Sequence, residues 1–213
     1  MSPPAEEDKP SPEQVKEATA ALAQLLANSK HAIVGGAAVL LLGSSRGTED
    51  VDVVVPQGQT KAARDLIKTY GQGKFSVDPR TLHTYYLSTP PVEIEILTPP
   101  GLFRGTFNQN TQTMAVTHNN TTVQILHPAA ILDAKCGAIG GRATEAKKQS
   151  DAQDIIHLLM WLKSQNMSLF ADNVPNASVE WVQWFVSIYG YGNYDYWKNV
   201  GWTESGASFL SKN

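Results

Sequence analysis

Residues 33–55 read IVGGAAVLLLGSSRGTEDVDVVV, a stretch that contains a Gly-Gly pair and an Asp-Val-Asp-Val pattern. Successive side chains of a β-strand point to opposite faces, so Asp50 and Asp52 project from one face and Val51 and Val53 from the other. Two neighbouring carboxylates repel each other unless a cation lies between them. Mg²⁺ binds one or two protein carboxylates and fills its remaining positions with water and phosphate oxygens. The aspartate pair therefore predicts half of a metal site.

A pair of glycines, Gly35 and Gly36, separates an apolar run at residues 31–34 from a helix-like run at residues 37–42. This arrangement predicts a turn from a strand into a helix. Glycine tolerates unusual φ angles there and lets the backbone approach a ligand closely. Backbone N–H groups at a helix start, helped by the helix dipole, attract anions. We therefore expect a phosphate to bind between the glycines and the metal held by the two aspartates.

The order of these motifs resembles the signature of the nucleotidyltransferase superfamily related to DNA polymerase β. The similarity is to its small-molecule and toxin-type branches, such as the aminoglycoside nucleotidyltransferases, and it extends over Val34-Gly35-Gly36-Ala37-Ala38, Gly43, Arg46, Thr48 and Asp50-Val51-Asp52. In that family, the two aspartates bind metal and the glycines hold the triphosphate. The resemblance implies an α/β fold in which helices flank a mixed sheet and the C-terminal part is helical.

The family also has a third carboxylate on a later strand, more often an aspartate. The candidate in this chain is Glu95, within the strand-like run at residues 92–97. Glu93 is the alternative, because side chains two residues apart project to the same face of a strand. The resemblance implies that this third acid binds metal together with Asp50 and Asp52, or activates the acceptor directly.

Two cationic residues are candidates for binding the nucleotide. Lys135 lies in a segment that resembles the helices after the core in these branches, where a lysine reaches nucleotide phosphates. The alternative is that Lys135 is an exposed helix lysine. Arg46 is the second candidate phosphate ligand, and its alternative is a pairing with Glu49 or Asp50 that holds the acidic loop.

Two further acids, Asp151 and Asp154, lie about one helical turn apart. Helical residues at this spacing are neighbours, so salt bridges to Lys147 or Lys148 are the alternative to substrate contact. The histidines and the single cysteine show no spacing typical of zinc ligands. Zinc is therefore not expected. The aspartate pair and the resemblance imply Mg²⁺, or Mn²⁺ in its place, as the metal.

The composition is typical of a globular protein with one sizeable core: 213 residues, 42% of them hydrophobic, and no apolar run of membrane-spanning length. The net charge of −3 argues against a broad electrostatic surface for nucleic acid. The start of the chain lacks the basic and apolar pattern of a signal peptide, and Cys136 has no second cysteine to pair with. We therefore expect a reducing cytosolic (cytoplasmic) or nuclear setting and no membrane anchor.

Composition divides the chain into a polar tail at residues 1–11, expected to be disordered, a nucleotidyltransferase core at residues 12–126 and a helical, aromatic-rich part at residues 127–213. Ser11-Pro12 predicts a helix start, with serine as N-cap and proline at the first helical position. Asn119-Asn120 is the expected turn of a hairpin. Helices are expected at residues 11–28, 36–43, 59–70, 129–140 and 144–164, and strands at residues 31–35, 50–55, 82–88, 92–97, 113–117 and 121–126.

The end of the chain, residues 166–213, holds four tryptophans and a tyrosine-rich run at residues 189–196. Aromatic side chains with polar tips can line an acceptor pocket or stack on bases. More often they serve the core or an interface, so packing is the favoured interpretation. In the alternative interpretation, Trp184 and Tyr191 are candidate residues of an acceptor pocket.

The function implied by the resemblance is metal-dependent transfer of an NMP from an NTP to a hydroxyl or similar acceptor on a small molecule or a protein. Asp50, Asp52 and Glu95 are the expected catalytic and metal-binding residues, and Gly35, Gly36, Arg46 and Lys135 are the expected nucleotide-binding residues. One alternative is a catalytically silent module that binds a nucleotide or a protein. Another is a toxin-like nucleotidyltransferase that acts on RNA, which the acidic net charge disfavours.

Overall fold

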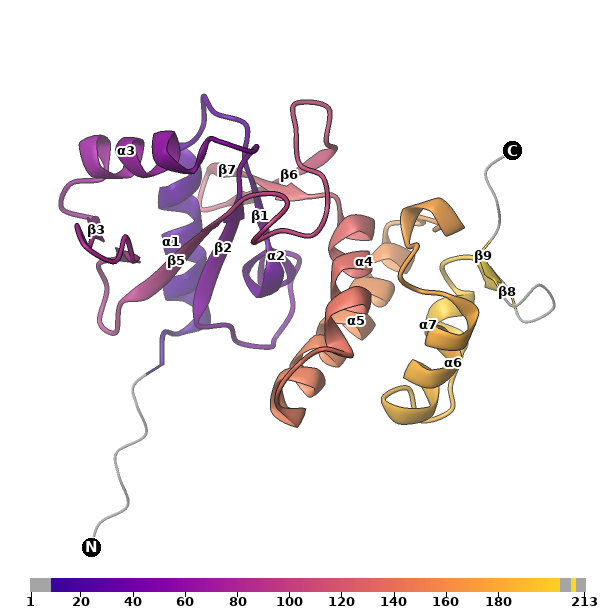
Figure 1. The fold of residues 1–213 in the computed structure, drawn as a ribbon. Coiled ribbons are helices and arrows are strands. Elements are labelled where there is room, and N and C mark those ends of the chain that lie inside the picture. Colours follow the sequence, from indigo (N-terminus) through magenta and orange to yellow (C-terminus); the bar gives the residue numbers. More distant parts are fainter. Residues whose placement is uncertain (1–8, 204–207, 210–213) are drawn as a thin grey trace, which may run out of the picture. The chain divides into compact units, whose positions relative to one another are not determined.

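A computed structural model describes residues 9–203 and 208–209 of the chain (Figure 1). Most of the predicted disordered tail, residues 1–11, lies outside the described residues. The chain forms two compact units. Unit 1 combines Met1–Leu41 with Gly47–Ile125, and unit 2 combines the short segment Leu42–Arg46 with Leu126–Asn213.

Unit 1 is built on one mixed sheet of seven strands in the order β3-β4-β5-β2-β1-β7-β6. The pairs β2–β5 and β1–β7 are parallel, whereas β1–β2, β3–β4 and β4–β5 are antiparallel. Its elements are α1 (Pro12–Leu25), β1 (Ala32–Val34), α2 (Gly35–Leu41), β2 (Asp50–Val54), α3 (Thr60–Tyr70), β3 (Phe75–Val77), β4 (Thr84–Tyr86), β5 (Val92–Leu97), β6 (Thr113–His118) and β7 (Thr121–Leu126).

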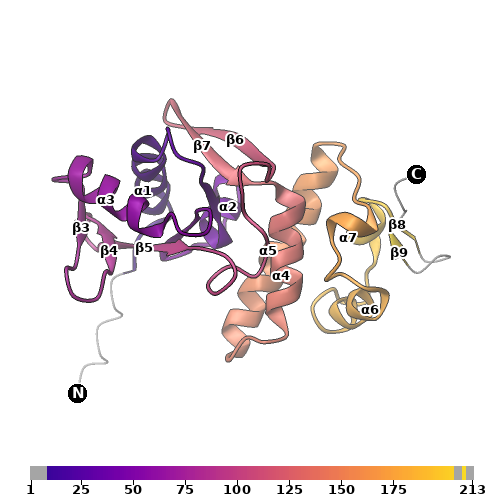
Figure 2. The same cartoon turned by 45° about the horizontal axis from the view of Figure 1, so that its top comes forward.

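The two faces of the sheet differ in the middle, where β2 and β5 lie side by side. One face is apolar and buried, and it carries Val51, Val53, Ile94 and Ile96. The opposite face is half-buried or exposed, and it carries Asp50, Asp52, Glu93 and Glu95. α1 packs against β2, β5 and α3, and Figure 2 shows α1 next to α3. Burial of the apolar face therefore fixes the acids on the other one.

Local signals in the sequence explain how two elements of unit 1 begin or turn. The hydroxyl of Ser11 accepts a hydrogen bond from the backbone N–H of Gln14 at 3.3 Å, and the Gln14 side chain accepts one from the N–H of Ser11 at 2.8 Å. This capping box confirms the predicted start of α1. Asn119 and Asn120 both have positive φ angles, 45° and 60°, which a tight hairpin turn between β6 and β7 requires.

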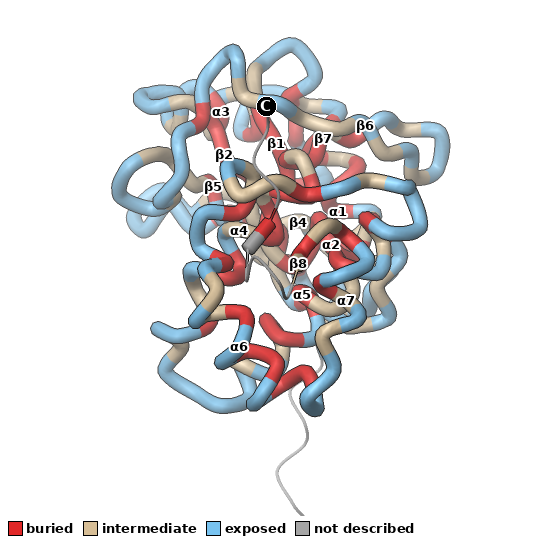
Figure 3. Tube along the Cα trace, turned by 90° about the vertical axis from the view of Figure 1, so that its right-hand side faces the viewer, coloured by how far each residue is buried: buried red, intermediate tan, exposed pale blue. Residues whose placement is uncertain are grey.

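Unit 2 is helical, apart from a short two-stranded sheet. Its elements are α4 (Pro128–Ile139), α5 (Glu145–Ser164), a 3₁₀ helix η1 (Ala171–Asn173), α6 (Val179–Ile188), α7 (Asp195–Lys198), β8 (Trp202–Thr203) and β9 (Ser208–Phe209). α4 packs against α5, and α5 against α7. Val182, Phe185 and Val186 form the buried face of α6. The residues between them are exposed, so buried and exposed stretches follow each other along this helix (Figure 3).

The predicted α/β architecture, a mixed sheet flanked by helices with a helical C-terminal part, is confirmed. Most predicted elements lie within two residues of the observed ones, although α1 ends at Leu25 instead of residue 28 and β4 covers only Thr84–Tyr86. The prediction missed β3 and placed no element beyond residue 164. Within the described residues, no helix is both long enough and apolar enough to cross a membrane.

Candidate active site

The acids of unit 1 come together through the register of two parallel strands. Asp50 of β2 lies opposite Glu93 of β5, and Asp52 lies opposite Glu95. Paired residues of neighbouring strands project to the same face. The structure therefore brings the two predicted metal-binding aspartates and both candidates for the third acid onto one face of the sheet.

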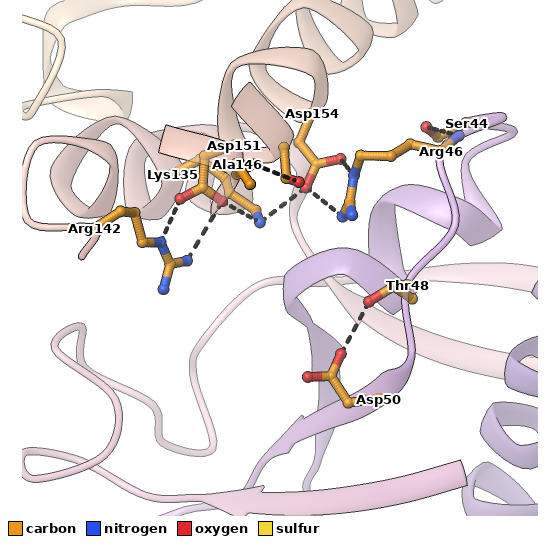
Figure 4. Close-up of polar contacts among 10 residues, drawn as sticks. Ser44, Arg46, Thr48, Asp50, Lys135, Arg142, Ala146, Asp151 and Asp154 are labelled. Atoms are coloured by element: carbon orange, nitrogen blue, oxygen red, sulfur yellow. Dashed lines mark hydrogen bonds and ion pairs between the residues drawn. The ribbon is translucent and has the colours of Figure 1, made fainter. Parts of the chain in front are cut away.

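Asp50 is held in place by a neighbouring hydroxyl. The Thr48 Oγ1 atom donates a hydrogen bond to Oδ1 of Asp50 at 2.9 Å (Figure 4). Thr48 itself is almost fully buried, with 9% of its surface exposed. A carboxylate that is bonded through one oxygen to a buried partner keeps one orientation, which a metal ligand requires.

Gly35 lies directly against Asp52. Its φ angle is +62°, a region that other residues rarely adopt. A Cβ atom added at Gly35 would collide with Oδ2 of Asp52 and lie only 3.1 Å from its Cγ. Both the backbone conformation and the space therefore require glycine at this position. α2 has only seven residues, so its helix dipole is small. The close approach of the Gly35 backbone to Asp52 is therefore the feature of the glycine motif that matters more for binding a phosphate.

The two candidates for the third acid have different surroundings. Nδ1 of His83 lies 2.8 Å from Oε1 of Glu93, and the rings of His83 and Tyr85 stack with an interplanar angle of 14°. The Glu93 carboxylate is thus paired with a neighbouring imidazole ring. Glu95 lies in register with Asp52, the aspartate that contacts the glycine turn.

The carboxylates fit a hard cation that takes few protein ligands. Among residues 9–203 and 208–209, no group of three or more His, Cys, Asp or Glu side chains is placed so that it could hold a metal ion. Mg²⁺ does not need such a group, because it commonly keeps several waters and binds through one or two carboxylates together with substrate phosphates. Asp50 and Asp52, on one half-buried face, provide such a donor pair.

In unit 2, the predicted nucleotide ligand Lys135 is buried and not an exposed helix lysine. Only 8% of its surface is exposed. Its Nζ lies 2.7 Å from Oδ1 of Asp151 and 2.8 Å from Oδ2 of Asp154. The predicted alternative of a solvated lysine is therefore wrong. Two carboxylates neutralise the ammonium group, which a buried lysine requires.

Arg46 also pairs with Asp154. Its Nε donates to Oδ1 at 2.6 Å and one terminal nitrogen donates to Oδ2 at 2.8 Å, so the contact is bidentate. The partners are 108 residues apart in the sequence, so no local sequence pattern predicts this pair. Of the partners predicted as the alternative, Glu49 forms a salt bridge with Lys9 at 2.8 Å and Asp50 accepts a hydrogen bond from Thr48.

Asp151 completes this group of charges. Oδ2 of Asp151 accepts a hydrogen bond from Nε of Arg142 at 2.6 Å (Figure 4). Burial by itself would raise the pKa of Asp151, but the hydrogen bond from Arg142 and the charge of Lys135 outweigh burial and lower that pKa. The predicted alternative partners, Lys147 and Lys148, are wrong, because Asp151 and Asp154 pair with cations from other segments.

Five aromatic side chains in the described part of unit 2 are buried in its core, in agreement with the packing interpretation: Phe185, Tyr189, Trp197, Trp202 and Phe209. Trp197 and Phe185 are fully buried, and their ring centroids lie 5.8 Å apart in an edge-to-face arrangement. Trp184 and Tyr191 are instead exposed, with 37% and 97% of their surfaces accessible. Tyr191 also has a positive φ angle of 51°. Both side chains are therefore open to solvent, and neither lines the cleft in unit 1 described next.

A cleft of about 240 Å³ in unit 1 is separate from the predicted site residues. It is lined by Asn28, Ser29, Lys30, Val55, Pro56, Gln59, Ala62, Ala63 and Gln109. None of the predicted catalytic, metal-binding or nucleotide-binding residues lines this cleft.

No family model matches the chain, and no curated protein shows significant similarity to it. Solved structures with a similar fold were found. An antigenic nucleotidyltransferase-like protein from Paracoccidioides brasiliensis is 22% identical, with a TM-score of 0.64 over 93% of this chain and 94% of that one. JHP933 from Helicobacter pylori is 14% identical, with a TM-score of 0.54 over 86% and 81% of the two chains. The chain therefore has the nucleotidyltransferase fold that its glycine and aspartate motifs predicted.

Proposed function

We propose that this protein is a metal-dependent nucleotidyltransferase that moves an NMP from an NTP to a hydroxyl or similar acceptor on a small molecule or a protein. The observation that supports this most is the face shared by Asp50, Asp52 and Glu95, with the backbone of Gly35 against Asp52. The fold of the similar structures agrees with nucleotidyl transfer as the general reaction.

The predicted metal ligands and nucleotide ligands each have a role in the proposed reaction. Asp50 and Asp52 would hold Mg²⁺ or Mn²⁺, with Glu95 as the third ligand or as the base. When bound, the metal neutralises charge on the phosphates. The N–H groups of Gly35 and Gly36 would bind the β and γ phosphates. Arg46 and Lys135 stay predicted nucleotide ligands, since guanidinium and ammonium groups both suit phosphate oxygens.

The chemical step needs no covalent intermediate. Glu95 would accept the proton of the acceptor hydroxyl, whose oxygen attacks the α-phosphorus in line. A new oxygen–phosphorus bond forms, the bond between the α-phosphorus and the bridging oxygen breaks, and pyrophosphate leaves with that oxygen. We assign this role to Glu95 because it lies opposite Asp52, the aspartate beside Gly35, whereas the Glu93 carboxylate is already paired with Nδ1 of His83.

The competing function is a catalytically silent module that binds a nucleotide or a protein partner. The described residues favour it in one respect, because the acids do not form a compact group of three or more metal-binding side chains. The third position also carries Glu95, where the family more often has aspartate.

Thermal-shift measurements with ATP, CTP, GTP and UTP, each with and without Mg²⁺, test the proposal. A ligand that binds only the folded state raises the melting temperature, so at least one NTP should raise it only when Mg²⁺ is present. Asp52→Asn should lose this metal-dependent rise. Asp65→Asn is its matched control and should keep the rise, since Asp65 pairs with Lys61 on the surface of α3. Mass spectrometry of candidate acceptors then separates the two functions. Metal-dependent binding without product supports a silent module that binds nucleotide. Binding of no NTP contradicts the proposed function and leaves only a module that binds a protein partner.

A further inference from the structure

Five charged residues of unit 2 form one connected group, named here the aspartate network: Arg46, Asp154, Lys135, Asp151 and Arg142 (Figure 4). Cations and carboxylates alternate along it. Asp154 binds Arg46 and Lys135, and Asp151 binds Lys135 and Arg142. The nitrogen–oxygen distances of the ion pairs lie between 2.6 and 2.8 Å, so every link is a short, charge-assisted contact.

The network gathers cations from three different segments. Arg46 comes from the segment Leu42–Arg46, Lys135 from α4, and Arg142 from the residues between α4 and α5. Both carboxylates come from α5, where residues three apart share one face. A single face of α5 therefore sets the positions of three cationic side chains.

Stability alone does not account for this arrangement. The side chains of Asp154 and Asp151 are 0% and 3% exposed, so both charges have been removed from water. Desolvation of buried ion pairs is so costly that apolar side chains of similar volume often stabilise a protein as well or better. What apolar residues could not do is hold a guanidinium and an ammonium group in fixed orientations. The bidentate contact with Arg46 leaves that guanidinium little rotational freedom.

We propose that Asp154 and Asp151 are positioning residues that preorganise cations for the triphosphate of the nucleotide. The inference rests on the proposed function, in which Arg46 and Lys135 bind phosphates. Ordering long cationic side chains before the ligand arrives removes an entropy cost from binding. Asp154 has the larger effect, because it holds both Arg46 and Lys135, whereas Asp151 holds Lys135 and Arg142.

The test compares two aspartates of unit 2 that receive the same substitution. Asp154→Asn removes the charge that orders Arg46 and Lys135 while keeping nearly the same shape. Asp133→Asn is the matched control, because the Asp133 carboxylate accepts hydrogen bonds from Asn176 and lies outside the aspartate network. Calorimetry with Mg²⁺-tripolyphosphate, and with each of the four Mg²⁺-NTPs, measures the dissociation constants. Circular dichroism confirms that each variant is folded.

Asp154→Asn should weaken tripolyphosphate and NTP binding about tenfold, with Asp133→Asn within about twofold of the wild type. In an Arg46→Ala background, the same Asp154→Asn change should have a smaller effect, because one of its two cations is already gone. If Asp154→Asn does not fold, Asp151→Asn replaces it and should also weaken binding, since it frees Lys135 from one of two carboxylates.

A folded Asp154→Asn or Asp151→Asn variant that binds as tightly as the wild type overturns the inference and leaves the proposed function intact. Equal weakening by Asp133→Asn also overturns it, because the effect would then be a general loss of structure. Failure of the wild type to bind any Mg²⁺-NTP overturns the proposed function and this inference together.

Discussion

The two units use aspartate pairs in opposite ways. In unit 1, Asp50 and Asp52 are half-buried on a strand, and Asp50 accepts a hydrogen bond from the neutral hydroxyl of Thr48. In unit 2, Asp151 and Asp154 are buried on a helix and bound to arginine and lysine. A carboxylate that is to bind a metal must stay accessible, whereas a carboxylate that is to hold a cation can be buried with it.

The comparison shows that the neighbours of a carboxylate, more than its spacing in sequence, indicate its role. Both pairs looked like candidates for substrate or metal contact when only the sequence was considered. Burial and charged partners separate them. The unit 1 pair suits the metal of the proposed reaction, and the unit 2 pair suits the ordering of cations.

The largest expected effect is on activity in unit 1. Asp52→Asn should lower Mg²⁺-dependent turnover or nucleotide binding by roughly 10²–10³-fold, because it removes a ligand at the point where charge develops. The fold should stay intact, and the metal-free melting temperature should stay equal or rise, since Glu95 loses a like charge opposite it. Calorimetric titration of Mg²⁺ and NTP measures the loss. Unchanged metal affinity in a folded variant would remove Asp52 from the site.

The second effect is on stability in unit 2. Asp154→Ala should lower the free energy of unfolding by about 3–5 kcal/mol, because Arg46 and Lys135 lose a buried counter-charge. Asp50→Asn should change it by less than about 1 kcal/mol. Urea denaturation of both variants gives the two numbers. Equal losses of stability would erase the distinction between the two aspartate pairs.

The third effect concerns the contact between the glycine turn and Asp52. Gly35→Ala should cost about 1–3 kcal/mol of stability from its positive φ, with a further loss of nucleotide binding as Asp52 is displaced. Gly58→Ala is the control, since Gly58 has a φ of +81° but open space at its Cβ position. Thermal melts and NTP titrations of both variants separate backbone strain from the collision. Normal NTP binding by Gly35→Ala would show that this close approach is not needed.

The fourth effect distinguishes the two glutamates of β5. Glu95→Gln should reduce turnover at least about tenfold more than Glu93→Gln, because only Glu95 lies opposite Asp52. Steady-state assays at saturating Mg²⁺ provide the comparison. Equal activity in the two variants would remove the role of Glu95, and a larger loss at Glu93 would move the third acid to the position beside Asp50.

The smallest effect is a pH dependence that the carboxylates do not cause. Burial lowers the pKa of His31, partly offset by backbone hydrogen bonds, and burial also lowers the pKa of His127. The unfolded chain therefore binds protons that the folded chain does not, so stability should be lost as the pH falls below about 6.5. The lowered pKa of Asp151 places its own contribution at more acidic pH.

Melting temperatures between pH 7.5 and pH 5.5 measure this dependence. Nδ1 of His127 accepts a hydrogen bond from the N–H of Ala129 at the start of α4, which the protonated ring cannot do. His127→Asn keeps a capping side chain without a titrating group, so its melting temperature should fall less on acidification. The same fall in wild type and variant would exclude His127 as a source.

Local patterns made much of unit 1 predictable. Alternation in β2 and β5, the capping box at Ser11 and the asparagine turn each depend on residues close together in the sequence. The pairing of β2 with β5 is not local, because α3, β3 and β4 lie between them in the chain. Only the family resemblance suggested that Glu95 lies near the two aspartates. The periodicity of the sequence did not.

Unit 2 was less predictable because its decisive contacts are long-range. Arg46 pairs with Asp154, 108 residues away in the sequence. Spacing along α5 suggested only Lys147 and Lys148 as partners of Asp151 and Asp154. The aromatic end of the chain has several tryptophans and tyrosines at spacings that suit either a core or a pocket. Only the three-dimensional arrangement shows that Trp197 and Phe185 are buried while Tyr191 is exposed.

The hydrogen bonds between Asp133 of α4 and Asn176, which precedes α6, affect covalent modification. Asn176-Ala177-Ser178 has the acceptor pattern for N-linked glycosylation. The Asn176 side-chain nitrogen, where a glycan would be attached, donates to the Asp133 carboxylate at 2.9 Å and lies close to Gly137. A sugar on that nitrogen would occupy the space beside Gly137 and disturb the hydrogen bond to Asp133. Asn176 is exposed, but a sugar on its side-chain nitrogen would have to displace the contact with Asp133 that joins α4 to the residues before α6.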